Sequence, residues 1–139
     1  MKTKAIICDL DDTLALIGDR DPYKTELAGQ DKLNKAVAEV LKHFHPDYEI
    51  LIVSGREENH KEVTVKWLID NRIVYSKLLM RPSGNHETTG IELKKQFYLG
   101  YIEPNYEVLF ALDDMFKICE MYRELGVPCF QVAKERFLK

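Results

Sequence analysis

Short apolar runs alternate with helical patterns along the whole chain, and this alternation restricts the fold more than any other feature of the sequence. The runs cover residues 5–8, 50–53, 77–80, 108–112 and 128–132. Continuous apolar runs of this length are typical of strands that are buried on both faces of a sheet. We therefore predict an α/β fold with a central parallel sheet of about five strands, helices on both faces and right-handed crossovers.

Apolar side chains recur at helical spacing between these runs. Asp31 is a candidate helix cap, because a stripe of apolar residues follows it until Pro46. Further helical faces begin near Val63, Leu93 and Ile118. The length of 139 residues favours one domain, residues 1–139.

Composition excludes several classes of protein. No apolar run reaches the ~20 residues of a membrane span, and the N-terminal run is too short and too soon followed by acids for a signal peptide. These features predict a cytoplasmic protein without a membrane partner. The net charge of −3 gives little general attraction for nucleic acid, so a polyanionic substrate needs a local group of cations.

Polar residues follow three of the predicted strands at the point where each strand ends. Asp9 follows the first strand, Ser54 follows the second, and Asp113 and Asp114 follow the fourth. The carboxyl ends of parallel strands lie at one edge of a sheet, where such folds bind their ligands. We therefore expect these distant segments to meet in one site.

The expected site is rich in carboxylates. They belong to Asp9, Asp11, Asp12, Asp113 and Asp114. Negative charges at close range repel each other unless protons or a cation offset them. Oxygen ligands alone favour a hard ion such as Mg²⁺, whereas Asp12 is expected to be a solvent-exposed loop acid.

Groups suited to an anion accompany the acids. Ser54-Gly55-Arg56 offers a hydroxyl, backbone N–H groups and a guanidinium, and Lys94 precedes the fourth strand on a predicted helix. An acidic metal site beside a set of phosphate-binding groups is typical of phosphoryl transfer.

These residues also resemble the four motifs of the haloacid dehalogenase (HAD) superfamily. Asp9-Leu10-Asp11-Asp12-Thr13 resembles the first motif, Asp-x-Asp-x-Thr. Ser54, Lys94 and Asp113-Asp114 resemble the second, third and fourth motifs, in the expected order. The resemblance implies a three-layer, Rossmann-like HAD fold. Because the ordered set is far more specific than one motif, it argues against a non-catalytic protein.

The HAD resemblance implies a role for each motif residue. Asp9 is expected to be the nucleophile that forms an aspartyl-phosphate, and Asp11 the general acid and then the general base. The expected ligands of Mg²⁺ are Asp9, Asp113, Asp114 and the main-chain carbonyl of Asp11. The expected phosphate-binding residues are Ser54, Gly55, Lys94 and Thr13, with helix capping as the alternative for Thr13.

A closer resemblance covers nearly the whole chain. Residues 20–23, 53–57, 111–114 and 126–133 are similar to the 3′-phosphatase domain of bacteriophage polynucleotide kinase-phosphatases. This similarity implies that Arg20 and Arg56 bind nucleic acid, although either arginine would also serve simply to offset the acidic cluster. No Gly-x-x-x-x-Gly-Lys-Ser/Thr loop is present, so we expect any kinase or ligase to be a separate partner.

Two positions depart from the pattern of this family. Asp12 stands where the family has a small residue, and the acidic residue expected shortly before the motif lysine is absent from residues 88–91. The second departure leaves Lys95 as an alternative to Lys94.

The spacing of the motifs bears on the substrate. HAD phosphatases of small molecules usually carry a cap domain after the first motif or before the motif lysine. The intervals from Leu14 to Asp31 and from Met80 to Lys94 are too short for a folded domain, which needs at least ~50 residues. An open site suits a nucleic-acid 3′-phosphate end, of DNA or RNA. The alternatives are a nucleotidase or other small-molecule HAD phosphatase, and a non-catalytic module that binds nucleic-acid ends.

Overall fold

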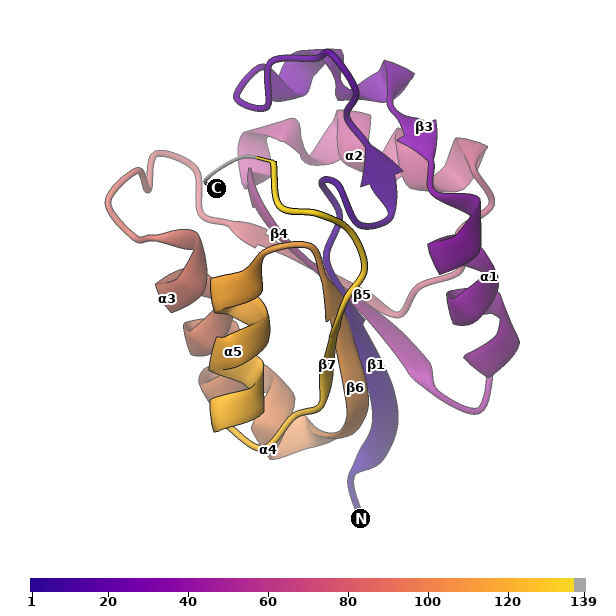
Figure 1. Ribbon diagram of the computed structural model, residues 1–139, viewed down its shortest axis with the longest axis vertical. Coiled ribbons are helices and arrows are strands. Elements are labelled where there is room, and N and C mark those ends of the chain that lie inside the picture. The colour runs from indigo at the N-terminus through magenta and orange to yellow at the C-terminus, as the bar shows by residue number, and fades with distance from the viewer. Residues whose placement is uncertain (137–139) are drawn as a thin grey trace.

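A five-stranded parallel sheet forms the centre of the molecule in the computed structural model, which describes residues 1–136 (Figure 1). The strands lie in the order β5-β4-β1-β6-β7. They are β1 (Thr3–Cys8), β4 (Glu49–Glu57), β5 (Lys77–Arg81), β6 (Tyr106–Asp113) and β7 (Cys129–Gln131). The predicted parallel sheet is therefore confirmed, and its first strand lies at the centre.

Helices cover both faces of the sheet (Figure 1). One face carries α1 (Lys35–Phe44) and α2 (Lys61–Asp70). The other face carries α3 (Gly90–Phe97), its π-helical continuation η3 (Tyr98–Ile102), the short α4 (Glu103–Asn105) and α5 (Phe116–Glu124). This three-layer arrangement is the predicted α/β architecture.

The central strand β1 supplies both apolar cores. Successive side chains of a strand point to opposite faces of the sheet. Ala5 and Ile7 pack in the core beneath α3 and α5, whereas Ile6 and Cys8 pack in the core beneath α1 and α2. All four side chains are at most 1% exposed. The end of β1 is consequently held from both sides, which fixes the residue that follows it.

The helix α1 begins later than predicted. Asn34, rather than Asp31, caps this helix, and its side-chain oxygen accepts a hydrogen bond from the backbone N–H of Val37 (3.5 Å). Asp31 instead follows a 3₁₀-helix, η1 (Thr25–Gln30). Both residue types are good caps, so the local sequence did not distinguish them.

The two intervals in which a cap domain would be inserted are short in the structure. After the first motif, β2 (Ala15–Leu16) pairs with β3 (Lys32–Leu33) in a small antiparallel ladder around η1. Residues 82–89 form a loop between β5 and α3. Neither segment of the described chain adds a domain above the sheet. None of the helices within residues 1–136 is long and apolar enough to cross a bilayer.

Candidate active site

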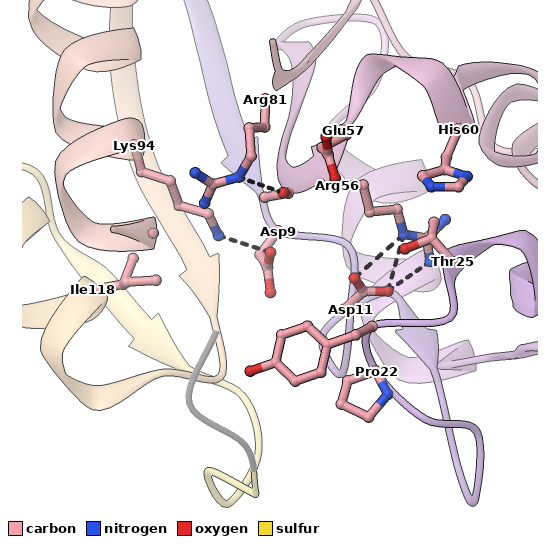
Figure 2. A pocket seen from close by; sticks show the side chains of 13 residues that line it. Asp9, Asp11, Pro22, Thr25, Arg56, Glu57, His60, Arg81, Lys94 and Ile118 are labelled. Atoms are coloured by element: carbon pink, nitrogen blue, oxygen red, sulfur yellow. Dashed lines mark hydrogen bonds and ion pairs between the residues drawn. The ribbon is translucent and has the colours of Figure 1, made fainter. Parts of the chain in front are cut away.

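Three of the predicted motif residues, Asp9, Asp11 and Lys94, line a cleft at one edge of the sheet. The cleft has a volume of about 160 Å³, and Asp9, Asp11, Arg56, Arg81 and Lys94 lie in its walls (Figure 2). The backbone N–H of Asp9 donates to the carbonyl of Leu112 (2.9 Å), which joins the end of β1 to β6. The predicted convergence of the strand ends is therefore confirmed.

Lys94 joins the ends of β1 and β6 through two carboxylates. Its Nζ lies 2.7 Å from Asp9 Oδ1 and 2.7 Å from Asp113 Oδ2. All three residues are at most 4% exposed. Burial by itself would lower the pKa of Lys94, but the carboxylates of Asp113 and Asp9 outweigh it and raise this pKa well above its usual value. Lys95 is exposed instead, so Lys94 is the lysine that reaches the site.

Three carboxylates in this part of the site can hold a metal ion. Oxygen atoms of Asp9, Asp113 and Asp114 all lie within 4.8 Å of one another, and the three residues are buried. Burial raises the pKa of Asp113, and the nearby charge of Asp9 raises it further, against the opposing effect of Lys94. The donor set is all oxygen, which fits a hard divalent cation such as Mg²⁺.

Thr13 supports the carboxylates of this cluster. Its hydroxyl donates to Asp9 Oδ2 (2.9 Å) and also lies 3.4 Å from Asp114 Oδ1. The residue is fully buried and caps none of the described helices. Of its two predicted roles, helix capping is therefore wrong. The structure shows Thr13 orienting Asp9, and contact with a phosphate stays a prediction.

A second charged network lies beside the first. Arg56 Nη2 contacts Asp11 Oδ1 (2.6 Å) and Asp31 Oδ2 (3.2 Å). Arg20 also bonds to both acids, with its Nε 2.9 Å from Asp31 Oδ1 and its Nη2 3.3 Å from Asp11 Oδ1. Two guanidiniums and two carboxylates balance each other. The network thus supports the alternative in which these arginines offset acidic charge.

Neighbouring polar groups hold this network in place. Arg56 Nη1 donates to the hydroxyl of Thr64 (2.9 Å) on α2. The indole N–H of Trp67, also on α2, donates to the carbonyl of Asp31 (2.7 Å). Such additional hydrogen bonds are needed to make buried ion pairs stable.

Ser54 and Gly55 lie in the last part of β4, which extends beyond the predicted run 50–53. The pairing of β4 with β5 is irregular between Val53 and Glu57. Ser54 is 1% exposed, and its Oγ accepts a hydrogen bond from the backbone N–H of Arg56 (3.1 Å). Gly55 lies in the wall of the cleft.

The prediction that Asp12 is solvent-exposed is wrong. Asp12 is only 5% exposed, and its carboxylate lies 3.4 Å from the guanidinium of Arg136. Arg136 also donates to the carbonyl of Gly18 (3.1 Å). Asp12 has a φ of 62°, a left-handed conformation that glycine adopts readily and aspartate tolerates better than most residues.

Sequence reasoning missed three residues of the site. Asp31 holds the two arginines, and Arg136 reaches Asp12 from beyond β7; neither had a local signal, because their partners are distant in sequence. Arg81 lies in the wall of the cleft. It ends β5, so the rule that strand ends carry the site residues would have found it.

Comparison with known proteins finds relatives over nearly the whole chain. A family model described as the polynucleotide kinase PNKP phosphatase domain matches residues 3–137. Two solved structures, of the Pnkp1/Rnl/Hen1 complex and the Pnkp1/Rnl/Hen1 RNA repair complex, contain chains that are 43% and 42% identical, with TM-scores of 0.90 and 0.92. Each match covers 98% of this chain.

A viral protein is similar over the same region. It is named as a bifunctional polynucleotide kinase/RNA ligase of Autographa californica nuclear polyhedrosis virus, and it is 30% identical over 137 residues, or 95% of this chain. The chain spans 20% of the viral protein, and 48% and 44% of the matching chains in the two solved structures.

The arginine network predicts a large effect of Asp31→Asn on stability. The change leaves Arg20 and Arg56 buried with one carboxylate between them, and breaking such a pair costs about 3–5 kcal/mol. The free energy of unfolding, measured with denaturant, should fall accordingly. Asp47→Asn is the control because Asp47 is exposed. If both variants were equally stable, the network would contribute nothing.

The contact between Asp12 and Arg136 predicts non-additive effects on stability. Arg136→Ala leaves the buried carboxylate without this partner and should cost about 1 kcal/mol. The loss should be smaller in an Asp12→Gly background, since glycine removes the carboxylate and accepts the positive φ. Four free energies of unfolding form the required double-mutant cycle. The same loss in both backgrounds would contradict the pairing.

Proposed function

Since this chain belongs to the family of polynucleotide kinase PNKP phosphatase domains, we propose that it removes phosphate groups from the 3′ ends of nucleic acids. Family membership makes it a HAD phosphatase, which is a phosphoric monoester hydrolase. The observation that carries the proposed chemistry is the position of Asp9 in the cleft, where Lys94 and Thr13 orient its two carboxylate oxygens.

Asp9 is the proposed nucleophile. One oxygen of its carboxylate attacks phosphorus, the bond from phosphorus to the 3′ oxygen breaks, and an aspartyl-phosphate forms. Water then attacks phosphorus and releases inorganic phosphate and Asp9. Lys94 is buried beside Asp9, so its fixed charge acts at low dielectric on the negative charge that develops in the transition state.

Asp11 is the proposed general acid and base. Its side chain is 15% exposed and lies in the wall of the cleft, whereas the side chains of Asp9 and Asp113 are 4% and 1% exposed. Arg56 and Arg20 fix its orientation. In the proposed sequence Asp11 gives a proton to the departing 3′ oxygen and then takes one from the attacking water, a contribution of roughly 10²–10⁴-fold.

Mg²⁺ is the proposed cofactor. Asp9, Asp113 and Asp114 are the side chains that would hold it, and the main-chain carbonyl of Asp11 remains a predicted ligand. When bound, the ion supplies positive charge that lets a phosphate approach the carboxylates. The close grouping of three buried carboxylates, with oxygen as the only donor atom, supports this assignment.

The open cleft supports a polynucleotide as substrate. Arg81 and Pro22 lie at opposite ends of the cleft, with Asp9 and Asp11 between them (Figure 2), and no inserted domain of the described chain closes over them. Ser54 and Gly55 are proposed to bind the transferred phosphate. Arg20 and Arg56 are proposed to assist recognition of the substrate by orienting Asp11. They are not proposed to bind a phosphate themselves.

The relatives support a role in nucleic-acid repair. The two solved neighbours come from Pnkp1/Rnl/Hen1 assemblies, one of them named as an RNA repair complex. Removal of a 3′-phosphate leaves a 3′-hydroxyl, which is the end that a ligase joins. We therefore propose that a kinase and a ligase, on the same or a separate chain, act on the ends that this domain produces.

The proposed function is tested by phosphate release from a 3′-phosphorylated oligonucleotide. The protein should release phosphate from it and transfer label from a 3′-³²P end to itself, and Asp9→Asn should abolish both, because the amide is not nucleophilic. Asp47→Asn is the control for the substitution. Retention of even a few per cent of turnover by Asp9→Asn would rule out this nucleophile. Faster release from nucleoside monophosphates would favour a nucleotidase, and binding without release would favour a recognition module.

Metal removal should have two measurable effects. Chelation should abolish phosphate release, and Mg²⁺ should restore it, because the cluster needs a cation before an anion can bind. Mg²⁺ should also raise the melting temperature of the protein, but not that of Asp113→Asn, which lacks one ligand. Full activity after exhaustive metal removal would contradict the metal site.

A further inference from the structure

Tyr23 is an exposed aromatic residue in the wall of the active-site cleft. It is 76% exposed, which is the highest value for any large apolar residue within residues 2–136. A single exposed apolar side chain is ordinary on a protein surface and needs no special role. Tyr23 differs from such side chains because it lines the cleft that holds Asp9 and Asp11, and because its loop is held in a defined conformation.

Hydrogen bonds within a tight turn fix the backbone of this loop. Asp21 Oδ1 accepts from the backbone N–H of Tyr23 (2.9 Å), and the backbone N–H of Lys24 donates to the carbonyl of Asp21 (3.0 Å). Arg20 Nη1 donates to the carbonyls of Asp21 (3.3 Å) and Lys24 (3.4 Å). Pro22 restricts φ at the second position of the turn. The backbone of Tyr23 is thus prepositioned, and an aromatic side chain with two rotatable bonds loses little entropy when a ligand orders it.

The loop of Tyr23 lies on the side of the cleft where the leaving group departs. Its Arg20 also reaches the proposed acid, with Nη2 at 3.3 Å from Asp11 Oδ1. A general acid has to reach the oxygen that leaves, so the nucleoside that carries the 3′ oxygen lies on the side of the phosphate that faces Asp11. Pro22, the neighbour of Tyr23, lies beyond Asp11 when the cleft is followed from Asp9 (Figure 2).

Two aromatic rings line the cleft in the part of the chain that the structure describes. They belong to Tyr23 and to His60, which ends the 3₁₀-helix η2 (Glu58–His60). His60 is only partly exposed, whereas Tyr23 has the larger ring and most of its surface open to a ligand. The flat face of a nucleobase stacks well on such a ring, and this contact tolerates every base because each has a π-face. Tyr23 is therefore the better platform for the departing nucleoside.

We propose that Tyr23 stacks on the base of the 3′-terminal nucleoside while the phosphate of that nucleoside lies at Asp9. The proposal rests on the proposed function and adds a part of the substrate that the site recognises besides its phosphate. A nucleoside 3′-monophosphate carries the same base, so it makes this contact as well. The contact therefore distinguishes substrates by the presence of a terminal base and not by the length of the strand.

The test compares two substrates that differ only in the terminal base. One is a 3′-phosphorylated oligonucleotide, and the other is the same oligonucleotide with an abasic sugar at its 3′ end. Tyr23→Ala should lower kcat/KM for the complete substrate about tenfold, mainly through KM, as expected for the loss of one stacked base. It should change kcat/KM for the abasic substrate little. Loss of the base should cost the unmodified protein a similar factor, and Tyr23→Phe should behave as the unmodified protein because it keeps the ring.

Control variants separate stacking from other effects of the substitution. Leu27→Ala removes another exposed apolar side chain, which belongs to η1 in the same segment and is 49% exposed outside the cleft wall. It should leave kcat/KM unchanged on both substrates. His60→Ala removes the second ring of the cleft and should retain the preference for a terminal base. Melting temperatures show whether each variant folds. If Tyr23→Ala does not fold, Tyr23→Leu takes its place, because leucine keeps an apolar side chain but has no flat face.

Three results would overturn the role of Tyr23 alone. The first is an equal effect of Tyr23→Ala on the complete and the abasic substrate, including no effect on either. The second is a loss in Tyr23→Phe as large as that in Tyr23→Ala, which would assign the effect to the hydroxyl. The third is a preference for a terminal base that His60→Ala abolishes and Tyr23→Ala retains. If the unmodified protein released no phosphate from any 3′ end, the proposed function would fail, and this inference with it.

Discussion

The concentration of negative charge at the carboxyl edge of the sheet is the constraint on which the site depends. The protein meets it in two different ways. Arg20 and Arg56 pair with Asp11 and Asp31 in one network, whereas Lys94 lies between Asp9 and Asp113 in the neighbouring carboxylate cluster. Because buried charges of one sign repel strongly, the second arrangement is the one in which we propose a bound cation. The two arrangements thus separate the carboxylates that we propose to hold a metal from the carboxylate that we propose to act as acid and base.

The sheet makes this division possible. β1 lies between β4 and β6, so the residues after three distant segments become neighbours at one edge. Ile6 and Ile7 are buried in the cores on opposite faces of the sheet. A shift of β1 by one residue would turn each of these side chains toward the other face. The packing of the strand therefore fixes the backbone position of Asp9 independently of the polar contacts that its side chain makes.

Much of the fold followed from local patterns, because buried parallel strands need continuous apolar runs and each strand end leads to the same edge. The same logic located Asp9, Asp113 and Lys94, whose convergence is confirmed and whose chemical roles remain predictions. It failed for Asp31, expected to cap a helix, and for Asp12, expected in solvent. The surroundings of both depend on arginines from other segments. An acid that meets a distant guanidinium looks the same in sequence as one that meets water, so only the folded chain distinguishes them.

The hydrogen bond from Trp67 to the carbonyl of Asp31 gives the site a natural spectroscopic reporter. Trp67 is the single tryptophan of the chain, and its ring is buried within the core beneath α2. Its indole N–H touches the residue that holds both arginines of the network beside the cleft. Any rearrangement of that network, on binding a ligand or on losing a partner, changes the polarity around the only indole fluorophore. The fluorescence emission of Trp67 in the unlabelled protein should therefore change when ligand binding rearranges the arginine network beside the cleft.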